Sequence, residues 1–223
     1  MHHIHLDQCA STQEYLKTYL EEDSFQEVLI SCSEQTDGKG RQGKSWIQGS
    51  HSLAFSFSLK PNPVVSLTSL EIGVLISMFF KSKFSLDIKL KWPNDLMVLD
   101  FKKCGGILCQ TYEKYLLVGI GINLGEIDFS PKDLSMEIAS LPIIGNQKDL
   151  PQEIYQYILE NRLSPEAVRP SWERLCAHLN REVIIENECG FFMGLGESGE
   201  LLLKTNLGIK KIFSGSLFLS PMS

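Results

Sequence analysis

The sequence lacks the features that place a chain outside the ordinary globular class. No uninterrupted apolar run approaches the roughly 18–20 residues that a membrane span requires, and the N-terminus Met1-His2-His3-Ile4-His5 lacks the charged-then-apolar layout of a signal peptide. No internal repeat and no low-complexity linker interrupts the chain. These absences argue against membrane, secreted and repeat proteins, and they predict a cytoplasmic location.

Closely spaced metal-ligating or disulfide-forming pairs are also missing. The six cysteines form no CxxC pair, and they stand at positions 9, 32, 104, 109, 176 and 189. A chain of 223 residues needs no disulfide framework, so reduced thiols are expected. The histidines at 2, 3 and 5 could bind a metal only weakly, because three side chains at a chain end rarely complete a coordination sphere.

Positive charge is in short supply, with 21 Lys+Arg against 27 Asp+Glu and a net charge of −6. This balance argues against a protein that coats nucleic acid or an anionic membrane, although it allows a local basic pocket. Hydrophobic residues at 43% and charged residues at 22% exclude disorder and collagen-like structure. A chain of this length buries about 70% of its unfolded surface, so a core of its own is expected.

Apolar periodicity predicts an α+β protein, because strands and helices follow one another without a regular βαβ repeat. A helix is expected from Ser11, strands at 28–30, 53–59, 88–92, 96–99, 106–110 and 116–123, and helices at 67–80, 131–140, 151–162 and 165–179. After residue 180 only short strands are expected, at 183–185, 191–193, 201–204 and 209–219. The chain therefore divides into a predicted main domain, 1–179, and a small β-domain, 180–223.

A glycine-rich loop, Gly38-Lys39-Gly40-Arg41-Gln42-Gly43-Lys44-Ser45-Trp46, fits both GxxxxGK[ST] and GxGxxG. Each pattern needs a strand directly before the glycines and a helix directly after them. Here polar residues 33–37 come first and a strand pattern follows, which disfavours a P-loop NTPase and a dinucleotide site. The glycines and three cations favour a loop that curls around a phosphate or carboxylate. A flexible surface loop is the alternative.

Four further segments settle the interpretation. In order along the chain they are Ser11-Thr12-Gln13, Lys91-Trp92-Pro93-Asn94-Asp95, Lys103-Cys104-Gly105-Gly106-Ile107-Leu108 and Val118-Gly119-Ile120-Gly121-Ile122-Asn123-Leu124, with Gln35 ahead of the glycine loop. The set resembles biotin–protein ligases, also called biotin–[acetyl-CoA-carboxylase] ligases, over nearly the whole chain. The resemblance implies a class II synthetase-like biotin/lipoate ligase fold, a mixed β-sheet flanked by helices, with a small C-terminal SH3-like β-domain.

The resemblance also implies a two-step reaction. Biotin's carboxylate attacks the α-phosphate of ATP, assisted by Mg²⁺, and gives biotinyl-5′-AMP and pyrophosphate. A lysine of the biotin carboxyl carrier protein then takes the biotinyl group and releases AMP. Some relatives carry an N-terminal winged-helix domain that binds DNA; here Ser11 stands too early for one, so a short form without nucleic-acid binding is expected. A monomer and a homodimer built on a sheet edge both stay open.

Roles carry over from the resemblance to positions of this sequence. Lys103 and Arg41 are the implied catalytic cations, and Asp95 is the implied Mg²⁺ contact. Residues implied to bind biotin are Ser11, Thr12, Gln35, Gly38, Lys39, Gly40, Arg41, Lys103, Gly106, Gly119 and Gly121. Residues implied to bind ATP are Arg41, Lys44, Trp46, Asn94, Asp95, Lys103 and Asn123.

Three positions depart from the family pattern. Lys39 and Gln42 stand where many relatives carry arginine. Lys39 keeps the positive charge but lacks the bidentate guanidinium, and Gln42 lacks the charge as well. Gln110 occupies a position that is often acidic. The rival hypotheses are a lipoate ligase or octanoyltransferase of the same fold, a P-loop NTPase, and a binding protein that keeps the pocket without activity.

Overall fold

The computed structural model describes residues 2–22, 27–46, 51–98, 101–113, 115–125, 138–145 and 147–219. Its elements follow in this order: β1 His2–Cys9, α1 Thr12–Glu22, β2 Val28–Gln35, η1 Arg41–Gly43, β3 Ser52–Leu59, η2 Val65–Leu67, α2 Thr68–Phe84, β4 Lys89–Lys91, β5 Asp95–Met97, β6 Lys103–Tyr112, β7 Tyr115–Asn123, α3 Leu150–Glu160, α4 Pro165–Leu175, β8 Glu182–Ile185, β9 Glu188–Leu195, β10 Leu201–Thr205, β11 Gly208–Ile212 and β12 Leu217–Leu219.

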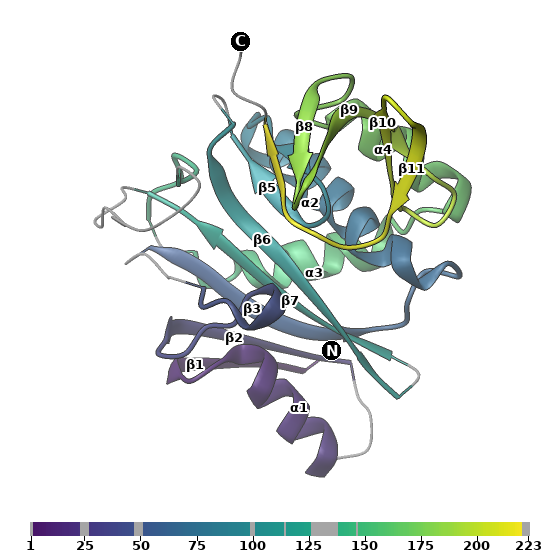
Figure 1. Ribbon diagram of the computed structural model, residues 1–223. Helices are drawn as coiled ribbons and strands as arrows, with labels where there is room; N and C mark the ends of the chain where they lie inside the picture. The colour runs from purple at the N-terminus through teal and green to yellow at the C-terminus, as the bar shows by residue number, and fades with distance from the viewer. Residues whose placement is uncertain are drawn as a thin grey trace.

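Two sheets organise these elements (Figure 1). The first has seven strands in the order β1-β2-β3-β7-β6-β5-β4; β1 and β2 are parallel and every other pair is antiparallel. The second has five antiparallel strands in the order β11-β10-β9-β8-β12. The predicted α+β class and the mixed sheet are confirmed.

Helices cover the two faces of the first sheet unequally. In β2, Val28 and Ile30 pack with Leu16 of α1, whereas Leu29 belongs to the main core on the opposite face with Tyr155 of α3. This division follows from the alternation of side chains along a strand. Helix α1 covers only part of its face, because it contacts β2, β3 and β7 but has few contacts with the strands beyond.

Small residues keep the rest of that face open. Phe55 and Phe57 of β3 point into the main core, so Ala54 and Ser56 lie on the α1 face. Their neighbours in β7 on this face are glycines: Gly121 pairs with Ala54, and Gly119 pairs with Ser56. A strip of the sheet therefore carries almost no side-chain volume, and a cavity forms above it.

Helix α2 is the centre of the main core. The segment Val65–Phe84 has the length and mean hydropathy, 1.4, of a membrane span, but 67% of its most apolar window is buried inside the fold. It packs against α3, α4 and β6. Burial on this scale is what a core helix requires, and apolar residues all round a helix serve that role.

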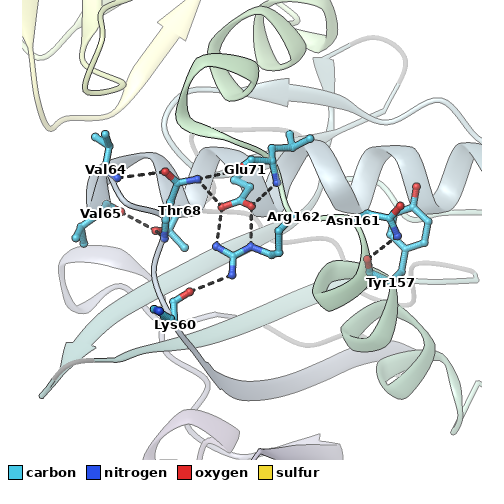
Figure 2. A network of polar contacts seen from close by, with 10 residues as sticks. Lys60, Val64, Val65, Thr68, Glu71, Tyr157, Asn161 and Arg162 are labelled. Carbon is cyan, nitrogen blue, oxygen red and sulfur yellow. Dashed lines mark hydrogen bonds and ion pairs between the residues drawn. The ribbon is translucent and has the colours of Figure 1, made fainter.

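One buried carboxylate ties α2 to its surroundings (Figure 2). Glu71 is fully buried, and its oxygens accept hydrogen bonds from Arg162 Nε at 2.7 Å, Arg162 Nη2 at 2.9 Å, the Leu163 backbone amide at 2.9 Å and Asn62 Nδ2 at 3.1 Å. The network joins α2 to the loop after β3 and to the segment between α3 and α4. Such a charge is tolerated inside a protein because its hydrogen-bonding capacity is filled.

The second sheet packs onto the first part of the chain rather than standing apart. Its buried residues, among them Phe192 and Leu203, belong to the same core cluster as α2 and β7. Trp92 Nε1 donates to the Gly199 carbonyl at 3.0 Å, and Ser66 Oγ donates to the Ser198 carbonyl at 2.7 Å. The second sheet begins at Glu182; the division into domains 1–179 and 180–223 stays a prediction.

Several elements differ from expectation. Strand β1 was not predicted, because its histidines hide the alternation; His3 and His5 side chains both bond to Ser31 Oγ, at 2.7 and 2.9 Å. Helix α4 ends at Leu175, since residue 176 turns extended and bridges to β4. The stretch 209–219 is two strands. Of the helix expected at 131–140, residues 131–137 lie outside the described residues, and residues 138–140 are not helical, because residue 138 bridges to Lys103 of β6.

Candidate active site

A cavity of about 250 Å³ lies on the α1 face of the first sheet. It is framed by the start of α1, the glycine loop, the β4–β5 turn, the glycines of β6 and β7, and the chain from Gly215 to Phe218. Every predicted site residue lines it except Gly38. Gly38 lies under the loop, where its carbonyl accepts from the Trp46 amide at 2.8 Å and where a Cβ would come within 2.8 Å of the Trp46 carbonyl.

The glycine loop closes on itself. Lys39 and Ser45 form an antiparallel bridge, and the Gly40 amide donates to the Lys44 carbonyl at 2.7 Å. Between them Gln42 adopts a left-handed conformation with φ 55°. The next described element after the loop is strand β3 rather than a helix. Among the described residues no helix N-terminus directly follows the glycines, as the phosphate-binding geometry of a P-loop or dinucleotide fold would require.

Trp46 forms part of the cavity wall because β7 has a glycine beneath it. A Cβ on Gly121 would come within 2.5 Å of the Trp46 ring. Any other residue at this position would push the indole away from the sheet. The glycine thus allows a close approach of a side chain to the strand.

One end of the cavity is cationic. Asp95 forms an ion pair with Lys103 and a longer one, 3.5 Å, with Lys91. Arg41 Nη1 reaches Asn94 Oδ1 at 3.5 Å. Lys44 also lines this region. In the described part of the cavity wall Asp95 is thus one carboxylate among five cationic side chains, Lys39 included, and the excess of positive charge suits an anionic ligand.

Burial makes that charge costly in the absence of a ligand. Desolvation lowers the pKa of Lys91, and Lys103 and Lys44 lower it further, while Asp95 acts in the opposite direction. Desolvation also lowers the pKa of Arg41, again opposed by Asp95. An incoming phosphate or carboxylate would relieve both groups, because an opposite charge favours the protonated form.

The other end is neutral and rich in hydrogen bonds. Gln35 Oε1 accepts from the Thr12 amide at 2.7 Å and from Thr12 Oγ1 at 3.0 Å, and Thr12 Oγ1 also bonds to Ser56 Oγ at 2.8 Å. Ser11 lies beside them, 4% exposed. The structure therefore brings together residues at the start of α1 and the end of β2 that were predicted to bind biotin. Thr12 and Gln35 are 23 positions apart in the sequence.

Several residues of the cavity wall were not predicted from the sequence. Lys91 begins the segment Lys91-Trp92-Pro93-Asn94-Asp95, and a lysine so close to Asp95 could have been predicted as a site residue. Ser56 alternates with phenylalanines, and a small polar residue in a buried strand is itself a signal. The residues from 215 to 218 gave no local signal, because their place depends on β12 pairing with β8 and on Lys91 lying 5.6 Å from the Phe218 ring centroid.

A family model, described as the biotin/lipoate A/B protein ligase family, matches residues 6–126, more than half of the chain. The chain belongs to this family. Among curated members, the bifunctional ligase/repressor BirA of Bacillus subtilis is 27% identical over 97% of this chain and 73% of its own length. BirA of Escherichia coli is 26% identical over 94% and 71%.

Solved structures of the family share this fold. A biotin protein ligase from Aquifex aeolicus, in complex with biotin and ATP, matches with a TM-score of 0.81 at 28% identity, and the alignment covers 98% of this chain and 99% of that one. A biotin acetyl coenzyme A carboxylase synthetase from Helicobacter pylori, with bound biotinylated ATP, matches with a TM-score of 0.72 at 26% identity over 94% and 99%. The predicted fold class, including the second small sheet, is confirmed, and the family membership supports biotin ligation.

Proposed function

We propose that this protein attaches biotin to a lysine of the biotin carboxyl carrier protein, with biotinyl-5′-AMP as the intermediate and ATP converted to AMP and pyrophosphate. The observation that carries the proposal is the division of one cavity into a neutral hydrogen-bonding end and a cationic end. Biotin has the matching division, since its fused ring is polar and uncharged while its side chain ends in a carboxylate.

The first step brings two anions together, so its barrier depends on fixed positive charge. A carboxylate oxygen attacks the α-phosphorus, and the bond to the pyrophosphate oxygen breaks. Lys103 and Arg41 are the proposed catalytic cations for this step. Lys44, Asn94 and Asn123 line the proposed nucleotide side with Trp46. Asn123 is held in place by Ser52 Oγ, which donates to its Oδ1 at 3.2 Å.

In the second step the carrier lysine's neutral amine attacks the carbonyl carbon of the mixed anhydride. An amide forms, AMP departs with the bonding electron pair, and the amine gives up a proton. A biotin ring held at the neutral end would place the reacting carbonyl near Lys103, where the carrier lysine must reach it. Positioning of this kind accounts for a large share of the rate in such transfers.

Mg²⁺ fits this site as an ion shared with ATP. The described residues contain no cluster of three or more acidic, histidine or cysteine side chains, and Asp95 is the carboxylate of the cavity wall. One carboxylate with phosphate oxygens and water is an ordinary Mg²⁺ environment. Asp95 would hold the ion, and the ion would neutralise phosphate charge. In this structure Asp95 is paired with Lys91 and Lys103.

The proposed setting is the cytoplasm, with the carrier domain as the macromolecular partner and neither nucleic acid nor membrane involved. The negative net charge supports this choice. Strand β1 lies at one edge of the first sheet, and a homodimer would form through that edge.

Biotin-dependent exchange of labelled pyrophosphate into ATP tests the first step. We expect exchange with biotin and none with lipoate or octanoate, followed by transfer to a carrier domain, seen as a mass increase that a Lys→Arg carrier does not show. Exchange with lipoate or octanoate but not with biotin would assign the protein to the other branch of the family. Tight ATP and biotin binding without exchange would indicate a binding protein.

A further inference from the structure

Lys91 is a buried cation of the cavity wall to which the mechanism above gives no role toward the substrates. It ends β4, pairs in register with Asp95 of β5 across the turn between the two strands, and is 9% exposed. Its Nζ lies 3.5 Å from Asp95 Oδ2. Opposed residues of an antiparallel pair project their side chains to the same face, so the register places both charges in the cavity wall.

The second sheet supplies another partner for this ammonium group. The Phe218 ring of β12 lies under Lys91 Nζ, and the nitrogen is 5.6 Å from the ring centroid. Within about 6 Å the electron-rich face of an aromatic ring attracts a cation, and the attraction is larger where water is excluded. The Lys91 side chain is 11% exposed. The contact therefore belongs to the stronger, desolvated kind.

The backbone fixes both members of this contact. Leu217 points into the main core and is 1% exposed, so Phe218, the next residue of β12, points to the opposite face of the second sheet. Antiparallel pairing with β8 holds β12 in place. On the other side, the Ala177 amide donates to the Leu90 carbonyl of β4 at 2.9 Å. Ring and ammonium are thus held by two paired strands.

Asp95 alone would be a poor anchor for Lys91 during the reaction. Asp95 also forms the closer of its two ion pairs with Lys103, and it is the proposed Mg²⁺ contact. These cations share one carboxylate, whereas the attraction of the Phe218 ring for Lys91 does not weaken when Asp95 binds another cation. Phe218 can therefore keep Lys91 at the cationic end while ATP is bound.

We propose that Lys91 is a further cation of the site, which neutralises charge on the phosphates of ATP, and that Phe218 is its positioning residue, through which the second sheet acts on the first step. This inference rests on the proposed function. As the carboxylate oxygen bonds to the α-phosphorus, the bond to the bridging oxygen breaks and its electron pair leaves with pyrophosphate. A fixed ammonium group beside the phosphates stabilises that charge.

Lys91→Met tests the cation, since methionine fills a similar volume without charge. We expect the kcat of biotin-dependent pyrophosphate exchange to fall about 100-fold. The Kd of a non-hydrolysable ATP analogue, measured by calorimetry, should rise about 3- to 10-fold, whereas the Kd of biotin should stay within about threefold. Lys91→Arg keeps a charge that can stack on the ring, so its kcat should stay within about tenfold of the wild type.

Phe218→Leu tests the positioning role, and it should lower the kcat of exchange about 5- to 30-fold. Phe191→Leu is the matched control, because Phe191 lies in β9 of the same sheet, is 49% exposed and does not line the described cavity wall. Its exchange should equal that of the wild type.

Mono-, di- and trifluorophenylalanine at position 218 separate the electrons of the ring from its packing. Fluorine weakens the attraction of the ring for a cation and changes its shape little. The kcat of exchange should fall stepwise with the number of fluorine atoms. In the Lys91→Met background the same series should give a constant kcat, because the cation is absent.

Normal exchange and normal affinity for the ATP analogue in Lys91→Met, beside an active wild type, would remove the role of Lys91 and leave the proposed function intact. Equal losses in Phe218→Leu and Phe191→Leu, or a kcat that does not change along the fluorine series, would indicate a packing effect and remove the positioning role. A wild type without biotin-dependent exchange would overturn both the inference and the proposed function.

Discussion

Two carboxylates, the fully buried Glu71 and the partly buried Asp95, are surrounded by positive charge in opposite ways. Glu71 receives four hydrogen bonds, and its arginine partner also donates to the Lys60 carbonyl at 3.0 Å (Figure 2). Asp95 lies in the wall of a cavity that also contains Arg41, Lys44, Lys91 and Lys103. The first cluster is complete in itself, whereas in the second the described cavity wall holds several cations and one carboxylate.

This difference separates structural from functional charge. A filled network such as that of Glu71 fixes the relative positions of elements and has nothing left to bind. The cations around Asp95 stay protonated at a cost, since burial lowers the pKa of Lys91 and Arg41. Such under-neutralised clusters are typical of sites that bind or stabilise negative charge. Changes in the first cluster should affect stability, and changes in the second should affect catalysis.

The largest expected effect is on stability, from Arg162→Met. Removing the guanidinium leaves the Glu71 carboxylate buried with two of its four donors, which costs about 3–5 kcal/mol in free energy of unfolding. Urea denaturation measures this loss. Adding Glu71→Gln should recover part of it, because the uncompensated charge is then gone. A double variant as unstable as Arg162→Met alone would contradict the assignment of the effect to buried charge.

Lys103→Ala should abolish most adenylation and leave stability nearly unchanged. The Lys103 side chain is 32% exposed, so its truncation removes little packing. Loss of one charge that stabilises a transition state lowers the rate about 10²- to 10³-fold. Pyrophosphate exchange measures this effect, with Lys102→Ala as the matched control, because Lys102 does not line the cavity. Near-normal exchange in Lys103→Ala would remove its catalytic role.

A pH effect on stability is expected from His178, which lies between α4 and β8. The ring is 1% exposed and packs on Phe192 with centroids 4.7 Å apart. Burial, with smaller contributions from Lys91 and Arg181, lowers the pKa of His178 to about 3. Between pH 6.5 and 3 the unfolded chain binds a proton that the folded protein does not, so the free energy of unfolding falls as the pH falls.

The loss from His178 should reach about 2 kcal/mol at pH 5 and be absent above pH 7. Denaturation curves at pH 7 and pH 5 measure it. His178→Phe keeps an aromatic ring in the same packing and should remove this part of the pH dependence. An equal loss between pH 7 and pH 5 in wild type and variant would contradict the assignment to His178.

The smallest effect is expected at a surface ion pair. Lys83 and Glu153 are 2.6 Å apart, with side chains 40% and 42% exposed. Solvent screens such pairs, so Lys83→Ala should change the free energy of unfolding by no more than about 0.5 kcal/mol and leave exchange unchanged. A loss comparable to that of Arg162→Met would contradict the distinction between filled buried networks and exposed pairs.

Local patterns in the sequence were enough to predict most of the fold and the lining of the site. Helix α2, the β3 alternation and the glycine loop each have their signal within a few neighbouring residues, and the sequence motifs contain most of the residues at both cavity ends. Strand β1 and the Glu71–Arg162 pair were not predictable in this way. The first depends on parallel pairing with β2, and the second joins residues 91 positions apart.

The same limit applies to the cavity wall. Gln13 belongs to the Ser11-Thr12-Gln13 segment, but its position depends on a hydrogen bond to Gln110, 97 positions away, and on the missing side chain of Gly119. The residues from 215 to 218 reach the cavity because the second sheet packs against α4 and because the Phe218 ring lies beneath Lys91 of β4. Long-range contacts of this kind leave no local periodicity, since either partner alone is an ordinary polar or small residue.

A crystal structure with biotin and a non-hydrolysable ATP analogue tests the division of the cavity most directly. We predict that the fused ring lies against Thr12, Gln35 and Ser56, and that the carboxylate and the α-phosphate both lie within hydrogen-bonding distance of Lys103 or Arg41. A biotin in the reverse orientation, or phosphates bound away from the Asp95 cluster, would contradict the account.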